Sequence, residues 1–316
     1  MEQKKEQIAT LIIGNFDGIH LGHQELLKQA WQLKIKNGVK SVLLTFDPHP
    51  ADFLAKAAPP LLTTKEEKTL LLKYWFGVTE VIFLPFNAKM ANLTPEEFVD
   101  QYIFQYYSLK NIIVGFNFRF GKDGSGDAKL LSQIAASHGA NCTIVTPVED
   151  NKGNIISSTS IRKSLQDGNL DQANSMLGYW YNICGKVIHG NEFGRTIGFP
   201  TANIAFPEGK VVPKYGVYAV VCSFFGQAWT GVANIGYRPT IDENRKALLL
   251  ETNVLTDIDL PLYNEQMRVF LGKYIRPEQK FDSIQQLKEQ IAKDKAVAEK
   301  FIDELPDNSH LPRFFK

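Results

Sequence analysis

The order of predicted helices and strands changes near residue 178, and this change restricts the fold more than any other feature of the chain. Before it, short apolar runs alternate with stretches of helical periodicity. These runs are apolar at nearly every position, as in a parallel sheet that is covered on both faces. Beyond residue 178, strand-like runs follow one another without helices between them, which is typical of an antiparallel sheet or a small barrel.

A chain of 316 residues is too long for one ordinary core. We therefore predict an α/β protein with a parallel-sheet domain over 1–178 and an antiparallel β-barrel domain over 179–316. A helix from Ser283 to about residue 305 is expected to close the chain, because Ser283 and Gln286 resemble a capping box. The strands are expected at 10–16, 39–46, 79–84, 111–116 and 142–145 in the first domain, and at 181–188, 216–224, 228–235, 247–255 and 266–271 in the second.

Composition and charge narrow the classes of function. Hydrophobic residues make up 44% of the chain and charged residues 22%, as in a soluble globular protein. The formal net charge of +1 gives no global field that would recruit nucleic acid or an anionic membrane, and no apolar run is long enough to span a bilayer. The N-terminus lacks the apolar core of a signal peptide, and Cys142, Cys184 and Cys222 are too widely spaced for a disulfide framework. We expect a cytoplasmic protein without nucleic-acid or membrane partners, and no feature of the sequence indicates an oligomer.

A glycine-rich turn at 14–23 joins the first predicted strand to the first helix. Parallel sheets bind ligands beyond the C-terminal ends of their strands, which is where this turn lies. His20 and His23 fall on the same side of the first helical turn, close to its free N–H groups and the positive end of its dipole. Gly18 and Gly22 allow the backbone to approach a phosphate closely. The strand, the glycine-rich turn, the two histidines and the helix N-terminus together could stabilise the charge that develops on a pyrophosphate leaving group. We prefer this interpretation to a chance pair of histidines on the surface or in the core.

Two other segments of this half have both a functional and a structural interpretation. The segment 115–121 offers an amide and aromatic rings that could hold a flat ring, but core packing explains the same phenylalanines. The segment 157–162 begins a helix with four hydroxyl-bearing residues followed by Arg162, which can cap the helix or bind phosphate oxygens. Neither alternative is excluded for either segment.

A second glycine-rich loop, at 189–203, leads into an extended segment in the other half. On a strand, Thr201 and Asn203 point to the same face. Their side chains offer hard, neutral oxygen atoms, which can share Mg²⁺ with the phosphates of ATP. The glycines before them leave the backbone free to fold over a triphosphate.

Glu251 is the one acidic residue of a very apolar predicted strand at 248–255. A buried acid is unfavourable unless it has a partner or faces a cleft, so Glu251 is our candidate for a general base. A solvent-facing glutamate is the ordinary alternative. Arg276 is a further candidate for contact with a phosphate or a ring.

Taken together, these motifs resemble those of the prokaryotic bifunctional riboflavin kinase/FAD synthetases over essentially the whole chain. The segment His20 to His23 resembles the HxGH motif of their adenylyltransferase module, a Rossmann-like nucleotidyltransferase. The segments 45–50 and 158–162 are also typical of that module. The segments 189–203, 231–240 and 251–253 resemble the riboflavin kinase barrel.

The resemblance implies two reactions that use riboflavin, ATP and Mg²⁺ and yield FMN and FAD. The hydroxyl of riboflavin would attack the γ-phosphate of ATP in the barrel, and the phosphate of FMN would attack the α-phosphate of a second ATP in the N-terminal domain. At the kinase site the implied residues are Glu251 as base, Thr201 and Asn203 at Mg²⁺, Gly190, Gly194, Arg195 and Gly198 around ATP, and Arg276 at the flavin. At the adenylyltransferase site they are His20, His23 and Arg162 at the pyrophosphate, Gly14, Phe16, Asp17, Gly22, Ser158 and Thr159 around ATP, and Asn117, Phe118 and Arg119 at the flavin.

Two departures from the family pattern and two alternatives accompany this interpretation. Many members have His where Asn253 stands, and the segment 242–245 is more charged than expected. Because Asn and His can both donate a hydrogen bond, we expect Asn253 to change the rate of the reaction more than the type of reaction. One alternative is that a single half is active while the other is a flavin- or nucleotide-binding regulatory module. The other is a flavin-binding protein without turnover.

Overall fold

The computed structural model describes residues 6–7, 10–38, 40–54, 58–190, 193–239, 246–256 and 262–305. The chain forms two compact units, Met1–Ser158 and Thr159–Lys316. In the described ranges, no helix combines the length and the apolar character that crossing a membrane requires. The predicted fold class is confirmed in both units.

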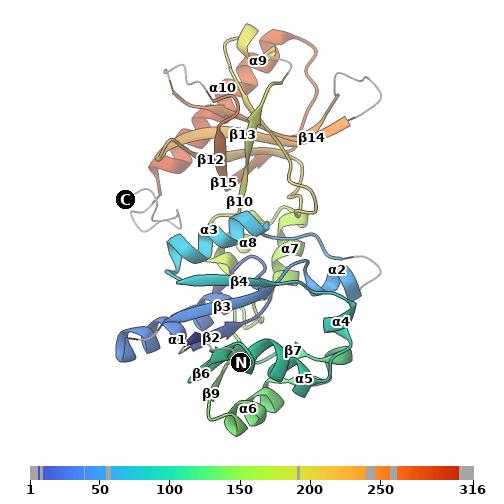
Figure 1. Ribbon diagram of the computed structural model, residues 1–316. Coiled ribbons are helices and arrows are strands. Elements are labelled where there is room, and N and C mark those ends of the chain that lie inside the picture. The colour runs from blue at the N-terminus through green and yellow to red at the C-terminus, as the bar shows by residue number, and fades with distance from the viewer. Residues whose placement is uncertain are drawn as a thin grey trace. The chain divides into compact units, whose positions relative to one another are not determined.

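The first unit is built on a five-stranded parallel sheet with the strand order β4-β3-β2-β6-β9 (Figure 1). Residues on both of its faces are inaccessible to solvent, for example Leu11 on one face and Ile12 on the other. Because β3 and β6 flank β2 on opposite sides, the strand order reverses at β2, and the turn after β2 lies at a topological switch point. The strands are β2 (Thr10–Ile13), β3 (Ser41–Phe46), β4 (Glu80–Leu84), β6 (Asn111–Gly115) and β9 (Asn141–Val145).

Helices cover this sheet. Thr94 caps α5: its side chain accepts a hydrogen bond from the N–H of Glu97, and Pro95 is the first helical residue. The helical elements are α1 (Leu21–Asn37), α2 (Pro50–Leu54), α3 (Lys65–Leu70), η1 (Leu71–Trp75), α4 (Ala88–Ala91), α5 (Pro95–Val99), η2 (Asp100–Phe104), η3 (Lys122–Gly124) and α6 (Ala128–Ser137). Short strands form two further pairs: β1 (Glu6–Gln7) with β5 (Tyr107–Ser108), and β7 (Arg119–Phe120) with β8 (Gly126–Asp127).

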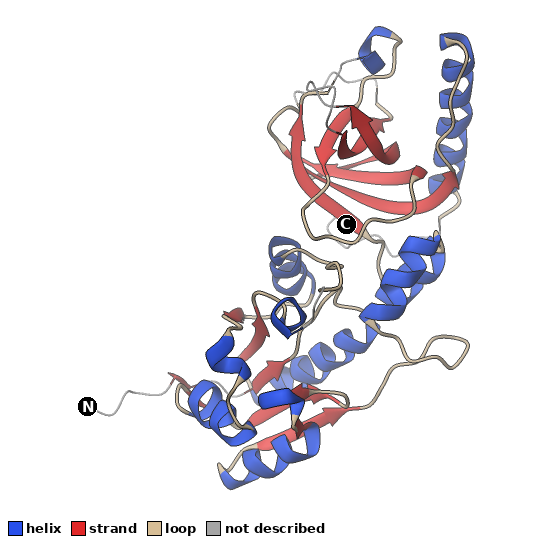
Figure 2. Ribbon diagram, turned by 90° about the vertical axis from the view of Figure 1, so that its right-hand side faces the viewer, coloured by secondary structure: helices blue, strands red, loops and turns tan. Residues whose placement is uncertain are grey.

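The second unit is a closed barrel of six antiparallel strands in the order β10-β11-β14-β13-β12-β15. Every second residue along a barrel strand points to the interior, and Ile235 of β13 and Leu250 of β14 are fully buried there. Figure 2 shows the barrel strands in red and α10 (Ile284–Asp303) along the outside of the barrel. The strands are β10 (Asn182–Ile188), β11 (Ala202–Ala205), β12 (Gly216–Phe224), β13 (Gln227–Pro239), β14 (Lys246–Val254) and β15 (Gln266–Arg276).

The closing helix is confirmed. Ser283 caps α10 by accepting a hydrogen bond from the N–H of Gln286 at 3.2 Å. Ala298 of α10 packs against Val217, Ala219 and Val232 on the outer surface of the barrel. This helix therefore covers the outer face of the barrel over β12 and β13.

Two helices before the barrel pack with it in the second unit. They are α7 (Ser158–Asp167) and α8 (Leu170–Leu177). Asn174 of α8 donates to the carbonyl of Leu271 at 2.9 Å and accepts from the N–H of Tyr181 at 2.8 Å. These bonds join α8 to the barrel. The compact units divide the chain after residue 158, and the domain boundary after residue 178 stays a prediction.

Candidate active sites

The turn after β2 has an unusual backbone. Phe16, Gly18 and Ile19 have φ angles of 51°, 80° and 41°. These angles lie in the left-handed region, which residues other than glycine rarely adopt. The Asp17 carboxylate fixes this turn by accepting hydrogen bonds from the N–H groups of Leu62 at 2.9 Å and Thr63 at 3.1 Å. Asp17 was expected near ATP, but its buried carboxylate is engaged in holding the turn.

The two histidines meet at the start of α1. His20 precedes the first residue of the helix, and its ring stacks on that of His23 with 3.8 Å between centroids. The ring of Phe16 lies against His23, with 4.9 Å between centroids. Gly22 packs closely on this arrangement, because a Cβ there would lie 3.1 Å from the ring of His20. The sequence thus places two imidazoles and a helix N-terminus together, as predicted.

The charge state of His23 depends on its burial. Burial, together with the nearby charges of His20 and Lys68, lowers the pKa of His23 well below the usual value, so this imidazole is neutral at neutral pH without a ligand. Among the described residues, Nδ1 of His23 has no hydrogen-bond partner. An anion bound here would favour the protonated form of His23, whose ring would then donate a hydrogen bond to the anion.

Lys68 is a buried cation that the sequence analysis did not single out. It lies on α3 with 6% of its surface exposed, and its Nζ donates to the carbonyl of Asn15 at 2.8 Å. Burial lowers its pKa, although Asp17 and Asp47 oppose the shift. The sequence could have indicated that Lys68 is buried, because it lies three and four residues before the buried Leu71 and Leu72 and so on the inward side of the helix.

The segment at 158–162 is partly joined to this site. The hydroxyl of Ser158 donates to the carbonyl of Asp17 at 2.8 Å, which brings the second motif to the first. Thr159 and Arg162 belong to the second compact unit, so their approach to the histidines stays a prediction. Gly14 continues the sheet by donating to the carbonyl of Leu44 at 3.2 Å.

The segment at 115–121 divides between core and surface. Phe118 packs against the main core and stacks with Phe120, with 5.5 Å between ring centroids. Arg119 is exposed on β7, and Asn117 lies between β6 and β7. The flavin contacts of Asn117, Phe118 and Arg119 stay predictions.

In the barrel, strand register brings three motifs into one row. Glu251 of β14 is paired directly with Asn203 of β11 on one side and with Asn234 of β13 on the other. Directly paired residues share a face, and here it is the outer face of the barrel, since the neighbours Leu250 and Thr252 are fully buried in the interior. The candidate base therefore lies between two side-chain amides.

The glycine-rich loop packs on this row. A Cβ at Gly190 would overlap the amide of Asn203, and one at Gly194 would overlap the carbonyl of Phe199 and lie 3.5 Å from Oγ1 of Thr201. Asn253 supports the same segment by donating to the carbonyl of Pro200 at 2.6 Å. This is a role for Asn253 at the position where the family pattern often has His.

The oxygen atoms at this row fit a hard cation. Oδ1 of Asn203 is buried, and it has no hydrogen-bond partner in the described part of the chain. A buried, unpaired carbonyl oxygen is unfavourable unless a ligand satisfies it. Mg²⁺ prefers such oxygen donors and keeps further positions for phosphate oxygens and water.

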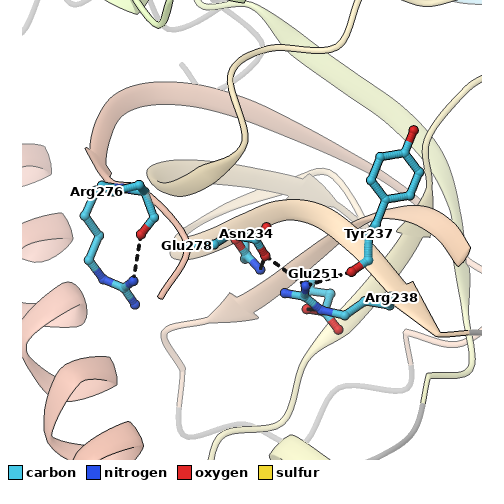
Figure 3. A network of polar contacts seen from close by, with 7 residues as sticks. Asn234, Tyr237, Arg238, Glu251, Arg276 and Glu278 are labelled. Carbon is cyan, nitrogen blue, oxygen red and sulfur yellow. Dashed lines mark hydrogen bonds and ion pairs between the residues drawn. The ribbon is translucent and has the colours of Figure 1, made fainter. Parts of the chain in front are cut away.

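Charged side chains link Glu251 to the start of the segment after β15 (Figure 3). Nε of Arg238 donates to Oε2 of Glu251 at 2.7 Å, and its Nη1 donates to Oε1 of Glu278 at 2.8 Å. Asn234 donates to the same oxygen of Glu278 at 3.0 Å. Burial alone raises the pKa of Glu278. The hydrogen bonds from Asn234 and Arg238, together with the charges of Arg238 and Arg276, outweigh burial and hold the pKa below its usual value, so the carboxylate is ionised at neutral pH. Glu251 is thus a partnered acid rather than an isolated one.

Arg276 has a different environment from the one expected. Its Nε and Nη2 donate to the carboxylate of Asp294 on α10 at distances of 2.8 to 3.1 Å, and its Nη1 donates to the carbonyl of Pro277. These contacts join β15 to α10. They give each nitrogen of the guanidinium a hydrogen-bond acceptor, so a ligand is not needed to explain its position. A flavin contact of Arg276 stays a prediction.

The pair of Arg276 and Asp294 leads to a stability prediction. Asp294→Ala leaves a largely buried guanidinium without its partner, since 17% of the Arg276 side chain is exposed. The free energy of unfolding of the barrel unit should fall by about 3–5 kcal/mol, measured by urea unfolding. Asp303→Ala, at an exposed position of the same helix, should change it by less than about 0.5 kcal/mol. Equal effects of the two substitutions would show that the pair does not stabilise the unit.

Other expected site residues are only partly placed. Gly198 has a φ angle of 89°, so a left-handed turn requires glycine there. The side chain of Arg195 and the charged segment 242–245 lie outside the part of the chain that the structure describes. Their predicted roles stay untested.

Comparisons with known proteins agree with the two sites. The family model of FAD synthetase matches residues 2–160, and that of riboflavin kinase matches residues 177–302. A bifunctional riboflavin kinase/FMN adenylyltransferase of Buchnera aphidicola is 38% identical over 297 residues, which are 93% of this chain and 94% of the relative. The protein of that name from Bacillus subtilis is 39% identical over 308 residues, 96% of this chain and 95% of the relative.

A solved structure resembles the whole chain. It is described as a macrolide-efflux protein from Streptococcus pneumoniae, and 35% of its residues are identical. The match has a TM-score of 0.83 and covers 94% of this chain and 95% of the other. With both family models and full-length relatives in agreement, the chain belongs to the family of bifunctional riboflavin kinases/FMN adenylyltransferases.

Proposed function

We propose that this chain converts riboflavin to FMN in the barrel unit and FMN to FAD in the parallel-sheet unit, with one ATP consumed in each step. The observation that carries the proposal is the row of Asn203, Glu251 and Asn234 on the outer face of the barrel. In this row an acid lies next to an amide oxygen that no described residue pairs with. The histidine pair at the start of α1 supports the second activity. Both halves keep their motifs, which favours two active sites over one active and one regulatory half.

In the first step the 5′-hydroxyl of riboflavin attacks the γ-phosphorus of ATP. The new bond joins this oxygen to phosphorus, the bond from phosphorus to the bridging oxygen breaks, and ADP leaves. Glu251 accepts the proton of the hydroxyl. Thr201 and Asn203 would hold Mg²⁺, which supplies neutralisation of the charge on the transferred phosphoryl group. The backbone at Gly190 and Gly194 would lie along the phosphates of ATP.

In the second step a phosphate oxygen of FMN attacks the α-phosphorus of ATP, and pyrophosphate leaves. The nucleophile is already ionised at neutral pH, so the site needs charge stabilisation more than a base. His20 and His23 provide donors to the leaving group at the N-terminus of α1, and Arg162 adds a guanidinium. We propose that both steps take place in the cytoplasm, where the three cysteines remain free thiols.

The direct test is to incubate the purified chain with riboflavin, ATP and MgCl₂ and to separate the flavins by chromatography. We expect FMN to form first and FAD to follow. FMN that accumulates without FAD, or FAD formed only from added FMN, would support a single active half. Flavin binding without either product would support a binding protein.

Removal of the unpaired amide oxygen tests the proposed metal site. Asn203→Ala should lower kinase turnover and raise the MgCl₂ concentration needed for half-maximal rate by about tenfold, because one oxygen ligand is lost. The measurement is FMN formation over a MgCl₂ titration. Formation of FAD from added FMN by the same variant is the internal control and should keep its MgCl₂ dependence. An unchanged titration of the kinase reaction would remove Asn203 from the metal site.

A further inference from the structure

One oxygen of the Glu251 carboxylate, Oε2, is engaged, and no described residue is hydrogen-bonded to the other, Oε1. Oε2 accepts from Arg238, and within the described ranges Arg238 is its only hydrogen-bonding partner. A general base works only when its lone pair is aimed at the proton it receives, and a third group commonly orients it. Among the described residues, Arg238 is the cation that forms an ion pair with this acid.

The guanidinium of Arg238 is itself held in place. Its Nη1 donates both to the carboxylate of Glu278 at 2.8 Å and to its neighbour's carbonyl, that of Tyr237, at 3.1 Å. Only 30% of its side chain is exposed. Burial lowers the pKa of Arg238, but Glu251 and Glu278 outweigh burial and raise it, so the group is a permanent cation between two carboxylates.

A glycine makes this bridge possible. Arg238 and Asn234 are on the same face of β13, and Gly236 lies between them on that face. A Cβ at Gly236 would lie 2.7 Å from Cδ of Glu278, so the missing side chain makes room for that carboxylate. Glu278 can then accept from Asn234 and Arg238 at once, as Figure 3 shows.

We propose that Arg238 is a positioning residue of the kinase reaction, which holds one oxygen of Glu251 so that the other faces the substrate hydroxyl, while Glu278 anchors Arg238. This inference rests on the proposed function, in which Glu251 is the base. Arg238 contacts neither the hydroxyl nor the phosphates in this role. Its effect passes entirely through Glu251.

The test is a double-mutant cycle on kinase turnover. Arg238→Gln should lower kcat for FMN formation by about 10- to 100-fold, because a misplaced base loses its alignment, and should change KM for riboflavin less than about threefold. In the Glu251→Gln background, the same substitution should lower kcat by less than about threefold, since nothing remains to be positioned. Arg238→Lys should recover only part of the rate, because one ammonium does not span two carboxylates as a guanidinium does.

Two controls keep the result interpretable. Glu278→Gln leaves the contact between Arg238 and Glu251 but weakens its anchor, so we expect a loss of about 3- to 10-fold. Arg268→Gln removes a guanidinium of β15 that forms no ion pair among the described residues, and it should have wild-type turnover. FAD formation from added FMN by each variant reports that the parallel-sheet unit is folded, and urea unfolding reports whether the barrel unit is folded.

The outcomes separate the two proposals. If Glu251→Gln retains its turnover, the assignment of the base is wrong, and the role of Arg238 falls with it. If Glu251→Gln is slow but Arg238→Gln is normal, or if Arg238→Gln is equally harmful in both backgrounds, the base stands and the positioning role of Arg238 is wrong.

Discussion

His20→Ala and His23→Ala should each lower the formation of FAD from FMN by at least about 100-fold, while the formation of FMN from riboflavin stays unchanged. The two rings stack at 3.8 Å at the start of α1, so each substitution removes a donor from the proposed pyrophosphate site and leaves its partner without support. The kinase motifs lie in the other compact unit. Chromatography of the flavins formed from riboflavin and from FMN measures both rates on one preparation.

His138→Ala is the matched control for these variants. His138 belongs to the same unit, but it is exposed and pairs with Asp100 at 3.0 Å, away from the turn after β2. We expect it to leave both reactions unchanged. Loss of both activities in a folded His20 or His23 variant would contradict the assignment of the two reactions to separate sites.

Glu251→Gln should lower kinase turnover by about 100- to 10,000-fold, the usual contribution of general-base catalysis. The substitution keeps the size of the side chain and can still accept a hydrogen bond from Arg238, but it removes the ability to take a proton. The affinity for riboflavin should change little, because the base acts mainly in the transition state. Steady-state kinetics of FMN formation give kcat and KM separately.

The same variant carries its own control in the other reaction. Formation of FAD from added FMN should proceed at the rate of the unaltered chain. Near-normal FMN formation would remove Glu251 from the role of base. A higher KM with unchanged kcat would instead make Glu251 a substrate contact.

Most of the fold could be predicted because its signals are local. The apolar runs of the first half and the strand runs of the second were sufficient for a parallel sheet and a barrel, and Ser283 marked the start of α10. The side of α1 that faces solvent was harder to predict, since the large apolar side chain of Trp31 on this helix is 56% exposed. A helix sequence shows its periodicity but not how wide a stripe its neighbours will cover.

The candidate sites could be predicted in composition but not in their contacts. Thr201 and Asn203 share a face because of strand period, which is a local property. The pairing of Asn203 with Glu251 depends on antiparallel register between segments 48 residues apart, which no local pattern specifies. Glu278 contacts Arg238 across 40 residues, and this contact could not be predicted for the same reason.

Two expected ligand residues were found to be engaged in structural contacts. Asp17 lies in a glycine-rich turn, and the sequence does not show that its carboxylate binds the N–H groups of Leu62 and Thr63. Arg276 is held by Asp294, because α10 folds back along the barrel. In both cases a distant element supplies the partner, which explains why the motif alone suggested a ligand.

The row of Asn203, Glu251 and Asn234 limits how this barrel can change in evolution. Because side chains alternate between the two faces of a strand, losing or gaining one residue inside β14 would turn Glu251 into the apolar interior and bring Leu250 outward. Point substitutions, in contrast, leave the pairing intact. We therefore expect related barrels to vary freely in the lengths of their loops while the stretch from Glu251 to the end of β14 keeps a constant length.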